Sequence, residues 1–151
     1  MRSVPGIAVS LWLGAMAFLA FCVAPAAFTT LDREAAGRLV TAIFPRYYLA
    51  AAVLAVLALL GCVARGAQDG WRRADWALLG LVLLMLALTL YAWLVVLPAA
   101  HAAREAIRGT GGSAAGESLR FARLHRLSGI LNGLVMIAGA AVLVAEAMRR
   151  P

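Results

Sequence analysis

Residues 76–97 read WALLGLVLLMLALTLYAWLVVL, twenty-two residues without one charged side chain. A helix needs about 20 mainly apolar residues to cross the hydrocarbon core of a bilayer. Backbone groups inside lipid must be hydrogen-bonded within the segment, so an unbroken run of this length predicts a transmembrane helix. Asp75 stands directly before the run and is expected to be its N-cap.

Three further runs, at residues 6–28, 47–63 and 127–147, are also mainly apolar. Of all residues in the chain, 64% are hydrophobic and 14% charged, whereas a soluble domain is about half apolar and a quarter charged. The four runs predict an all-α integral membrane four-helix bundle in which the whole chain, 1–151, forms a single transmembrane domain.

The connector between the first two runs is expected to form an interfacial amphipathic helix over about residues 31–44. Its apolar residues recur at every fourth position: Leu31, Ala35, Leu39 and Ile43. Thr29 and Thr30 are candidate N-caps, and Asp32 and Glu34 would lie in the first turn, where the helix dipole favours acidic side chains. Such a helix would lie in the membrane surface.

The first run has an alternative interpretation as a signal peptide. Arg2, the apolar stretch and Ala24-Pro25-Ala26 together resemble the pattern that precedes a cleavage site. The run is long for the apolar region of a signal peptide, and a proline between the alanines is unfavourable for cleavage. These two features favour a first helix that is retained.

The basic residues of the chain indicate whether it binds nucleic acid or the membrane surface. All 14 basic residues are arginines, and the net charge is +7. They are spread over every connector instead of forming a basic run, which argues against nucleic acid and favours anionic lipid headgroups, at roughly 1 kcal/mol per arginine near the surface. The arginines are denser on the side that holds both termini, so we expect a multi-pass protein of the cell inner (plasma) membrane with cytoplasmic termini.

Polar side chains gather on the membrane side opposite to the termini. His101 ends the third run and His125 begins the fourth, and Tyr47 and Tyr48 start the second run on the same side. We therefore expect any functional site to lie on this histidine-bearing side.

One helical stripe in the fourth run supplies the other ligand-binding candidates. Phe121, His125, Ser128 and Asn132 are spaced at i, i+4, i+7 and i+11 and share a helix face. A side-chain amide one turn inside the hydrocarbon needs partners, so the stripe is expected to face the bundle interior. Either Ser128 and Asn132 fix the register of neighbouring helices, or the stripe belongs to a ligand site together with Tyr47 and Tyr48.

A haem or copper site is a further alternative, with His101 and His125 as ligands on adjacent helices and Glu105 near His101. The chain has no Cys-x-x-Cys, His-Glu-x-x-His or Cys-x-x-Cys-His motif. We therefore expect no cofactor.

Short motifs along the chain carry a resemblance to a known family. They are Val23-Ala24-Pro25, Phe28, Ala36-Gly37, Phe44-Pro45-Arg46-Tyr47-Tyr48, Arg120-Phe121, Leu124-His125-Arg126-Leu127-Ser128 and Asn132. In order and spacing the chain resembles the transmembrane protein 205-like family, a domain-of-unknown-function family of four-helix membrane proteins. It is more faintly similar to the membrane domain of copper-resistance D proteins. The resemblance implies a retained first helix and a multi-spanning fold, and it implies no catalytic residue.

Three functional hypotheses follow. The first is a non-enzymatic membrane protein that binds a small ligand, a lipid or a partner on the histidine-bearing side. The second is a transporter, or transport accessory, for a metal or small cation, and the third is a redox protein that holds haem or copper through His101 and His125. No motif fixes a reaction, which favours a non-enzymatic function and leaves an enzyme open. The sequence also leaves open a homo-oligomer and a membrane partner protein.

Overall fold

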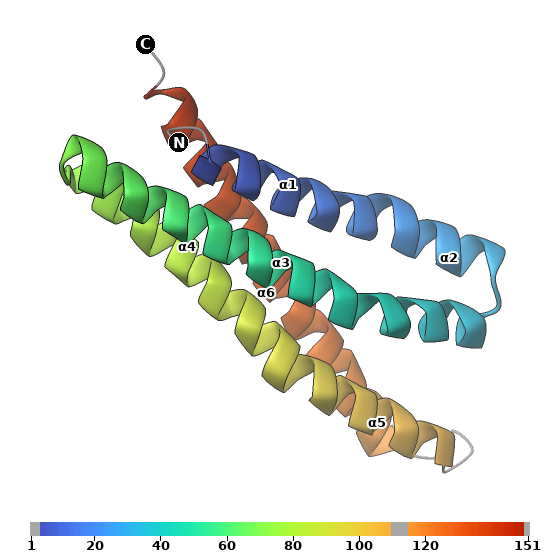
Figure 1. Cartoon of the computed structure of the whole chain (residues 1–151). Helices are drawn as coiled ribbons and strands as arrows, with labels where there is room; N and C mark the ends of the chain where they lie inside the picture. The colour runs from blue at the N-terminus through green and yellow to red at the C-terminus, as the bar shows by residue number, and fades with distance from the viewer. Residues whose placement is uncertain (1–3, 110–114, 150–151) are drawn as a thin grey trace.

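A computed structural model describes residues 4–109 and 115–149, and within these ranges every regular element is helical. In chain order the elements are α1 (Val4–Phe18), η1 (Leu19–Val23), α2 (Ala24–Thr30), α3 (Arg33–Asp69), α4 (Arg73–Tyr91), η2 (Ala92–Val96), α5 (Leu97–Gly109) and α6 (Ala115–Ala147). Since α1, η1 and α2 are continuous, as are α4, η2 and α5, they build four long helices that run alternately up and down (Figure 1). The predicted four-helix bundle is confirmed.

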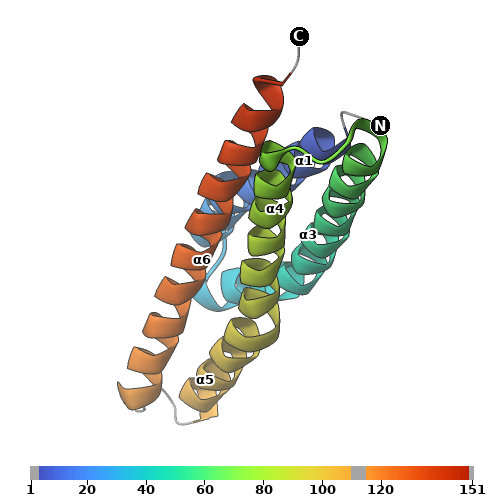
Figure 2. The ribbon, with the colours of Figure 1, turned by 90° about the vertical axis from the view of Figure 1, so that its left-hand side faces the viewer.

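All four helices are long and apolar enough to cross a membrane. Both termini lie at one end of the bundle, which we call the terminal end, and the α2–α3 turn lies at the other, the histidine end (Figures 1 and 2). The helices over Arg33–Asp69 and Arg73–Gly109 have 37 residues each, or about 55 Å at 1.5 Å per residue. A hydrocarbon core is about 30 Å thick, so these helices extend well beyond it.

The helix expected over residues 31–44 is not separate from the second span. It is the first part of α3, which continues through Pro45 to Asp69 without a break (Figure 1). A proline inside a helix removes one backbone hydrogen bond, but Phe44 and Tyr48 on either side of Pro45 pack into one apolar cluster. That packing holds the two parts together as a single helix.

Two expected helix caps are placed differently in the structure. Thr29 and Thr30 end α2 instead of capping the next helix, because their hydroxyl groups donate to backbone carbonyls one turn earlier. Asp32 caps α3: its Oδ1 accepts from the backbone N–H groups of Ala35 and Glu34 at 2.8 and 2.9 Å. The Ala35 N–H holds the pKa of Asp32 below its ordinary value, and the Glu34 N–H acts in the same direction.

Asp75 is likewise not the N-cap of α4, the helix that begins the third span. Arg72 occupies that position, and Asp75 at the third helical position accepts a 3.0 Å hydrogen bond from the Arg72 backbone N–H. This is the reciprocal half of a capping box. Gly70, at φ 79°, ends α3 in a conformation that favours glycine.

Two of the four helices contain a π turn shortly before a proline. The backbone N–H of Ala24 bonds to the carbonyl of Leu19, and that of Leu97 bonds to the carbonyl of Ala92. In each case the next residue is a proline, Pro25 or Pro98. A proline ring clashes with the carbonyl four residues earlier in an α-helix, and the wider π turn relieves that clash.

The core lies between α1, α3, α4 and α6. Trp12, Val9, Val82 and Val142 are fully buried in it. Helix α1 approaches α3 closely at Gly61, where a Cβ would lie 2.9 Å from Pro5 Cδ. Small residues of this kind allow close backbone contact in membrane bundles, where tight packing replaces the hydrophobic effect as the driving force.

Candidate functional site

A pocket of about 220 Å³ lies at the histidine end between the first turns of α3 and helix α5. We call it the basic pocket, and it is lined by Arg38, Thr41, Ala42, His101, Arg104, Glu105 and Arg108. Three of these side chains are permanently charged guanidinium groups, and one is a carboxylate. The pocket therefore carries a positive charge.

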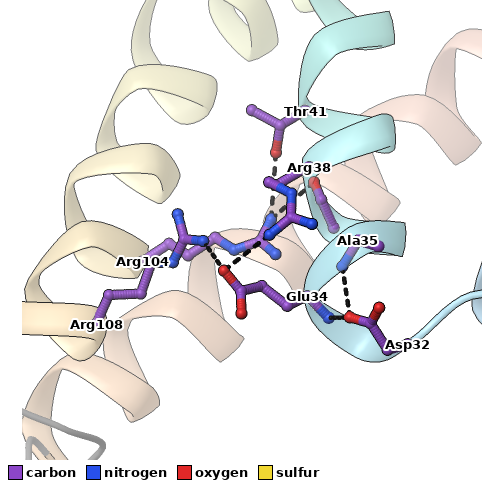
Figure 3. Close-up of polar contacts among 8 residues, drawn as sticks. Asp32, Glu34, Ala35, Arg38, Thr41, Arg104 and Arg108 are labelled. Atoms are coloured by element: carbon purple, nitrogen blue, oxygen red, sulfur yellow. Dashed lines mark hydrogen bonds and ion pairs between the residues drawn. The ribbon is translucent and has the colours of Figure 1, made fainter.

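Arg104 is the residue that joins α5 to α3 across this pocket (Figure 3). Its Nη1 donates to the Gly37 carbonyl at 2.9 Å and to the Thr41 hydroxyl at 3.2 Å. A Cβ on residue 37 would lie 1.6 Å from Arg104 Nη2, so the guanidinium occupies the space that any other side chain would need. Glycine at position 37 is what admits Arg104 to this place.

Glu34 pairs with two of the three arginines of the pocket. Its Oε1 accepts from Arg38 at 3.0 Å and also from Arg108 (Figure 3). These side chains are about half exposed or more, so the pairs add little to stability. Even when Glu34 and Glu105 are both counted against the three arginines, one positive charge remains in excess.

The structure separates the two histidines that the sequence analysis treats together. His101 lines the basic pocket with Glu105. His125 is exposed on α6, where its ring stacks on Phe121 at a centroid distance of 6.2 Å. His125 therefore does not face the bundle interior, which corrects the expectation for this member of the stripe. His101 is the histidine that lines the pocket.

The inner part of the predicted stripe meets Tyr48. Tyr48 is buried, and its hydroxyl interacts with the side chains of Ser128 and Asn132. Its ring lies between two other aromatic rings, 6.0 Å from Phe44 and 6.2 Å from Trp93. This contact between α3 and α6 is the arrangement expected if Ser128 and Asn132 fix helix register.

Tyr47 differs from its neighbour in having an unpaired hydroxyl. It is 5.2 Å from Tyr48, centroid to centroid, and lies beside Trp12. The Tyr47 hydroxyl and Trp12 Nε1 face each other, but neither makes a hydrogen bond of ordinary geometry in the part of the chain that the structure describes.

The two tyrosines should respond differently to loss of the hydroxyl group. Tyr48→Phe breaks interhelical hydrogen bonds and is expected to lower the free energy of unfolding by about 1 kcal/mol. Tyr47→Phe removes an unpaired buried hydroxyl and should leave stability unchanged or slightly raised. Unfolding in mixed micelles, followed by circular dichroism, measures both variants. A larger loss for Tyr47→Phe than for Tyr48→Phe would contradict this assignment.

A metal site has no support among the described residues, which include no group of three or more His, Cys, Asp or Glu placed to hold an ion. His101 and Glu105 lie in the pocket, whereas His125 lies on another helix and stacks on Phe121. The haem or copper hypothesis stays a prediction.

The terminal end holds an ion-pair network that the sequence analysis missed. Arg65 Nη1 lies 2.6 Å from Glu146 Oε1, Arg65 Nε lies 3.5 Å from Asp75 Oδ1, and Arg149 Nη1 lies 2.5 Å from the same Asp75 oxygen. Arg65, Asp75 and Glu146 are each at most 8% exposed. The network ties α3, α4 and α6 together. One signal was available: Glu146 is the single acidic residue within the run 127–147, and a charge inside a span usually has a partner.

Comparison with known proteins gives one match. A family model described as Domain of unknown function (DUF4149) matches residues 7–108. This range holds every residue that lines the basic pocket. No curated protein and no solved structure matches the chain. The likeness to transmembrane protein 205-like or copper-resistance D proteins is not confirmed by this match.

Proposed function

The chain belongs to the DUF4149 family, and from that premise we propose that this multi-pass membrane protein binds a compact anionic group, a phosphate or a carboxylate, in the basic pocket. Membership of the family supplies no activity, so the proposal depends on the residues themselves. The observation that carries it is the convergence of Arg38, Arg104 and Arg108 on one pocket of about 220 Å³.

The chemistry of the lining suits an oxyanion. A guanidinium group presents five N–H donors in a fixed plane and binds phosphate or carboxylate through two of them at once. The hydrogen bonds of Arg104 to Gly37 and Thr41 use its Nη1, and Thr41 and His101 add further hydrogen-bonding groups to the lining. Since charge-assisted hydrogen bonds contribute about 1.5–3 kcal/mol each, loss of one arginine should weaken binding by tenfold or more.

The position of the pocket also favours an anion at the membrane surface. It lies in the parts of α3 and α5 beyond the central apolar segments, where the helices are longer than a bilayer requires. Both a soluble anion and the headgroup of an anionic lipid can reach such a position. The same residues would bind either one.

Titration of the purified protein in an uncharged detergent tests the proposal with two probes, soluble glycerol 3-phosphate and phosphatidylglycerol. Arg104→Ala is expected to weaken binding of at least one probe tenfold or more. Gly37→Ala keeps every charge but displaces Arg104, and it should weaken the same probe. Arg123→Ala is the matched control, because it removes an exposed charge of α6 outside the pocket. An equal loss in the control, or no loss in Arg104→Ala, would overturn the proposal.

A further inference from the structure

An apolar groove of about 460 Å³ lies on the other side of the first turns of α3 from the basic pocket. It is lined by Phe18, Cys22, Val23, Ala26, Ala27, Thr30, Leu31 and Leu39. Its largest side chains are well exposed, Phe18 at 62% and both Leu31 and Leu39 at 42%. The groove is therefore open to whatever surrounds the bundle.

The one hydroxyl group in the lining does not make the groove polar. Thr30 Oγ1 donates to the Ala26 carbonyl of its own helix at 2.6 Å, so its hydrogen-bonding capacity is used inside α2. Ala26 and Ala27 are small, which leaves the space between α2 and α3 unfilled. The groove offers dispersion contacts and no hydrogen-bonding partner, which suits a hydrocarbon chain.

The groove and the basic pocket use neighbouring residues of α3. Arg38 lines the pocket, and the next residue along the chain, Leu39, lines the groove. Both side chains are exposed. A charged cavity and an apolar one therefore flank the same turn of this helix.

The groove also has the direction and depth of a lipid chain. It begins beside the pocket at Leu31 and Leu39 and runs along α2 and η1 to Phe18, well inside the first span. Twelve residues of helix between Phe18 and Thr30 rise about 18 Å, close to the roughly 15 Å of hydrocarbon in one leaflet. Charge lies at the surface end of this path, and apolar surface lies along the rest.

We propose that the anionic group is the phosphate diester headgroup of an anionic phospholipid, held in the basic pocket while one acyl chain lies in the apolar groove. This inference rests on the proposed function and deepens it by naming the ligand class. Arg38, Arg104 and Arg108 select for the charge of the headgroup. The groove selects for a ligand that is anchored in the bilayer, so a soluble phosphate of the same headgroup loses this second contact.

Native mass spectrometry of the protein released from detergent tests the inference, with phosphatidylglycerol and phosphatidylcholine supplied in equal amounts. Binding of free glycerophosphoglycerol is measured alongside as the headgroup alone. Cys22→Trp fills the groove without altering the pocket. Leu60→Trp is the matched control, since Leu60 is 60% exposed on the surface of α3 away from both cavities.

The wild-type protein and Leu60→Trp should retain phosphatidylglycerol at least fivefold over phosphatidylcholine. In Cys22→Trp this retention should fall at least fivefold, while the affinity for glycerophosphoglycerol stays that of the wild type. Ala26→Leu, a smaller change in the same groove, should give an intermediate loss and serves if the tryptophan variant does not fold. Unchanged retention in both groove variants overturns the acyl-chain assignment, and the anion site then stands if Arg104→Ala still weakens binding. No effect of Arg104→Ala on any probe overturns the proposed function instead.

Discussion

Arg65→Met is expected to lower the free energy of unfolding by about 3 kcal/mol, a large effect for a single side chain. Arg65 is the shared partner of Glu146 and Asp75, at 2.6 and 3.5 Å, and its removal leaves buried carboxylates without that partner. Breaking a buried pair in this way costs about 3–5 kcal/mol. We expect the lower end of this range because the network lies near the end of the bundle, where water can reach a displaced side chain.

A double variant separates the charge effect from packing. Arg65→Met with Glu146→Met removes both ends of the Arg65–Glu146 pair and keeps the Arg149–Asp75 pair. It should be less destabilised than Arg65→Met alone, because the Glu146 carboxylate is no longer buried without its arginine partner. Arg120→Met is the control, since Arg120 and Glu117 are partly exposed and 3.6 Å apart, and it should change stability by less than 1 kcal/mol.

Equilibrium unfolding in mixed micelles measures these variants, with the thiol of Cys62 as a local reporter. Cys62 is 1% exposed and lies one turn before Arg65, whereas Cys22 is exposed. In a Cys22→Ser background, maleimide should therefore label Cys62 faster in Arg65→Met than in the wild-type chain. A double variant as unstable as the single one would show that the network acts through shape and not through charge.

Trp12→Ala should have the second large effect, a loss of about 2–4 kcal/mol. Trp12 is 0% exposed and packs in the core between α1, α3, α4 and α6. Truncation of a buried tryptophan costs about 3–5 kcal/mol in soluble proteins. We expect somewhat less here, since apolar burial from water adds little to helix association inside lipid and the loss is mainly one of packing.

A second variant, Trp12→Phe, tests the role of the indole nitrogen. Trp12 Nε1 has no hydrogen-bond partner in the described part of the chain, so Trp12→Phe removes an unpaired donor while it keeps most of the packing. Trp12→Phe should therefore lose less than half as much stability as Trp12→Ala. Trp76→Ala, at a position that is 58% exposed, is the control and should be close to neutral. A loss in Trp12→Phe equal to that in Trp12→Ala would mean that the N–H group has a partner after all.

The four spans could be predicted because their cause is local: each run is mainly apolar over about the length that a bilayer core requires. The ends of the helices could not be predicted in this way, because they depend on polar residues that suit a helix and a loop almost equally. Asp32 shows this well, since it was expected in the first turn and is instead the cap. Pro45 shows the reverse, because its local preference to end a helix is overridden by the packing of Phe44 and Tyr48.

The candidate site was predicted only in part for a related reason. The sequence pattern predicts a site at the end of the bundle that holds both histidines, and His101 and Glu105 line a pocket there. The same pattern treats Arg38, Arg104 and Arg108 as charges spread over the connectors. Their convergence depends on Gly37, whose lack of a side chain admits Arg104, and on the way α5 lies against α3. Neither can be read from spacing within a single helix. The network at the terminal end could not be predicted from spacing either, because Glu146 is far from Arg65 and Asp75 in sequence.

The π turn over Ala92–Val96 lets the helix over Arg73–Gly109 hold one extra residue without changing the register of its later part. A π turn acts as a one-residue insertion into an α-helix. Removal of one residue within Ala92–Val96 should therefore restore a regular helix and leave Arg104 above Gly37 and Arg108 beside Glu34, at the cost of a clash between the Pro98 ring and the preceding turn. A residue removed after Pro98 has no such compensation, and Arg104 would turn by about 100° away from Gly37. The basic pocket thus tolerates a change of chain length before Pro98 and not after it.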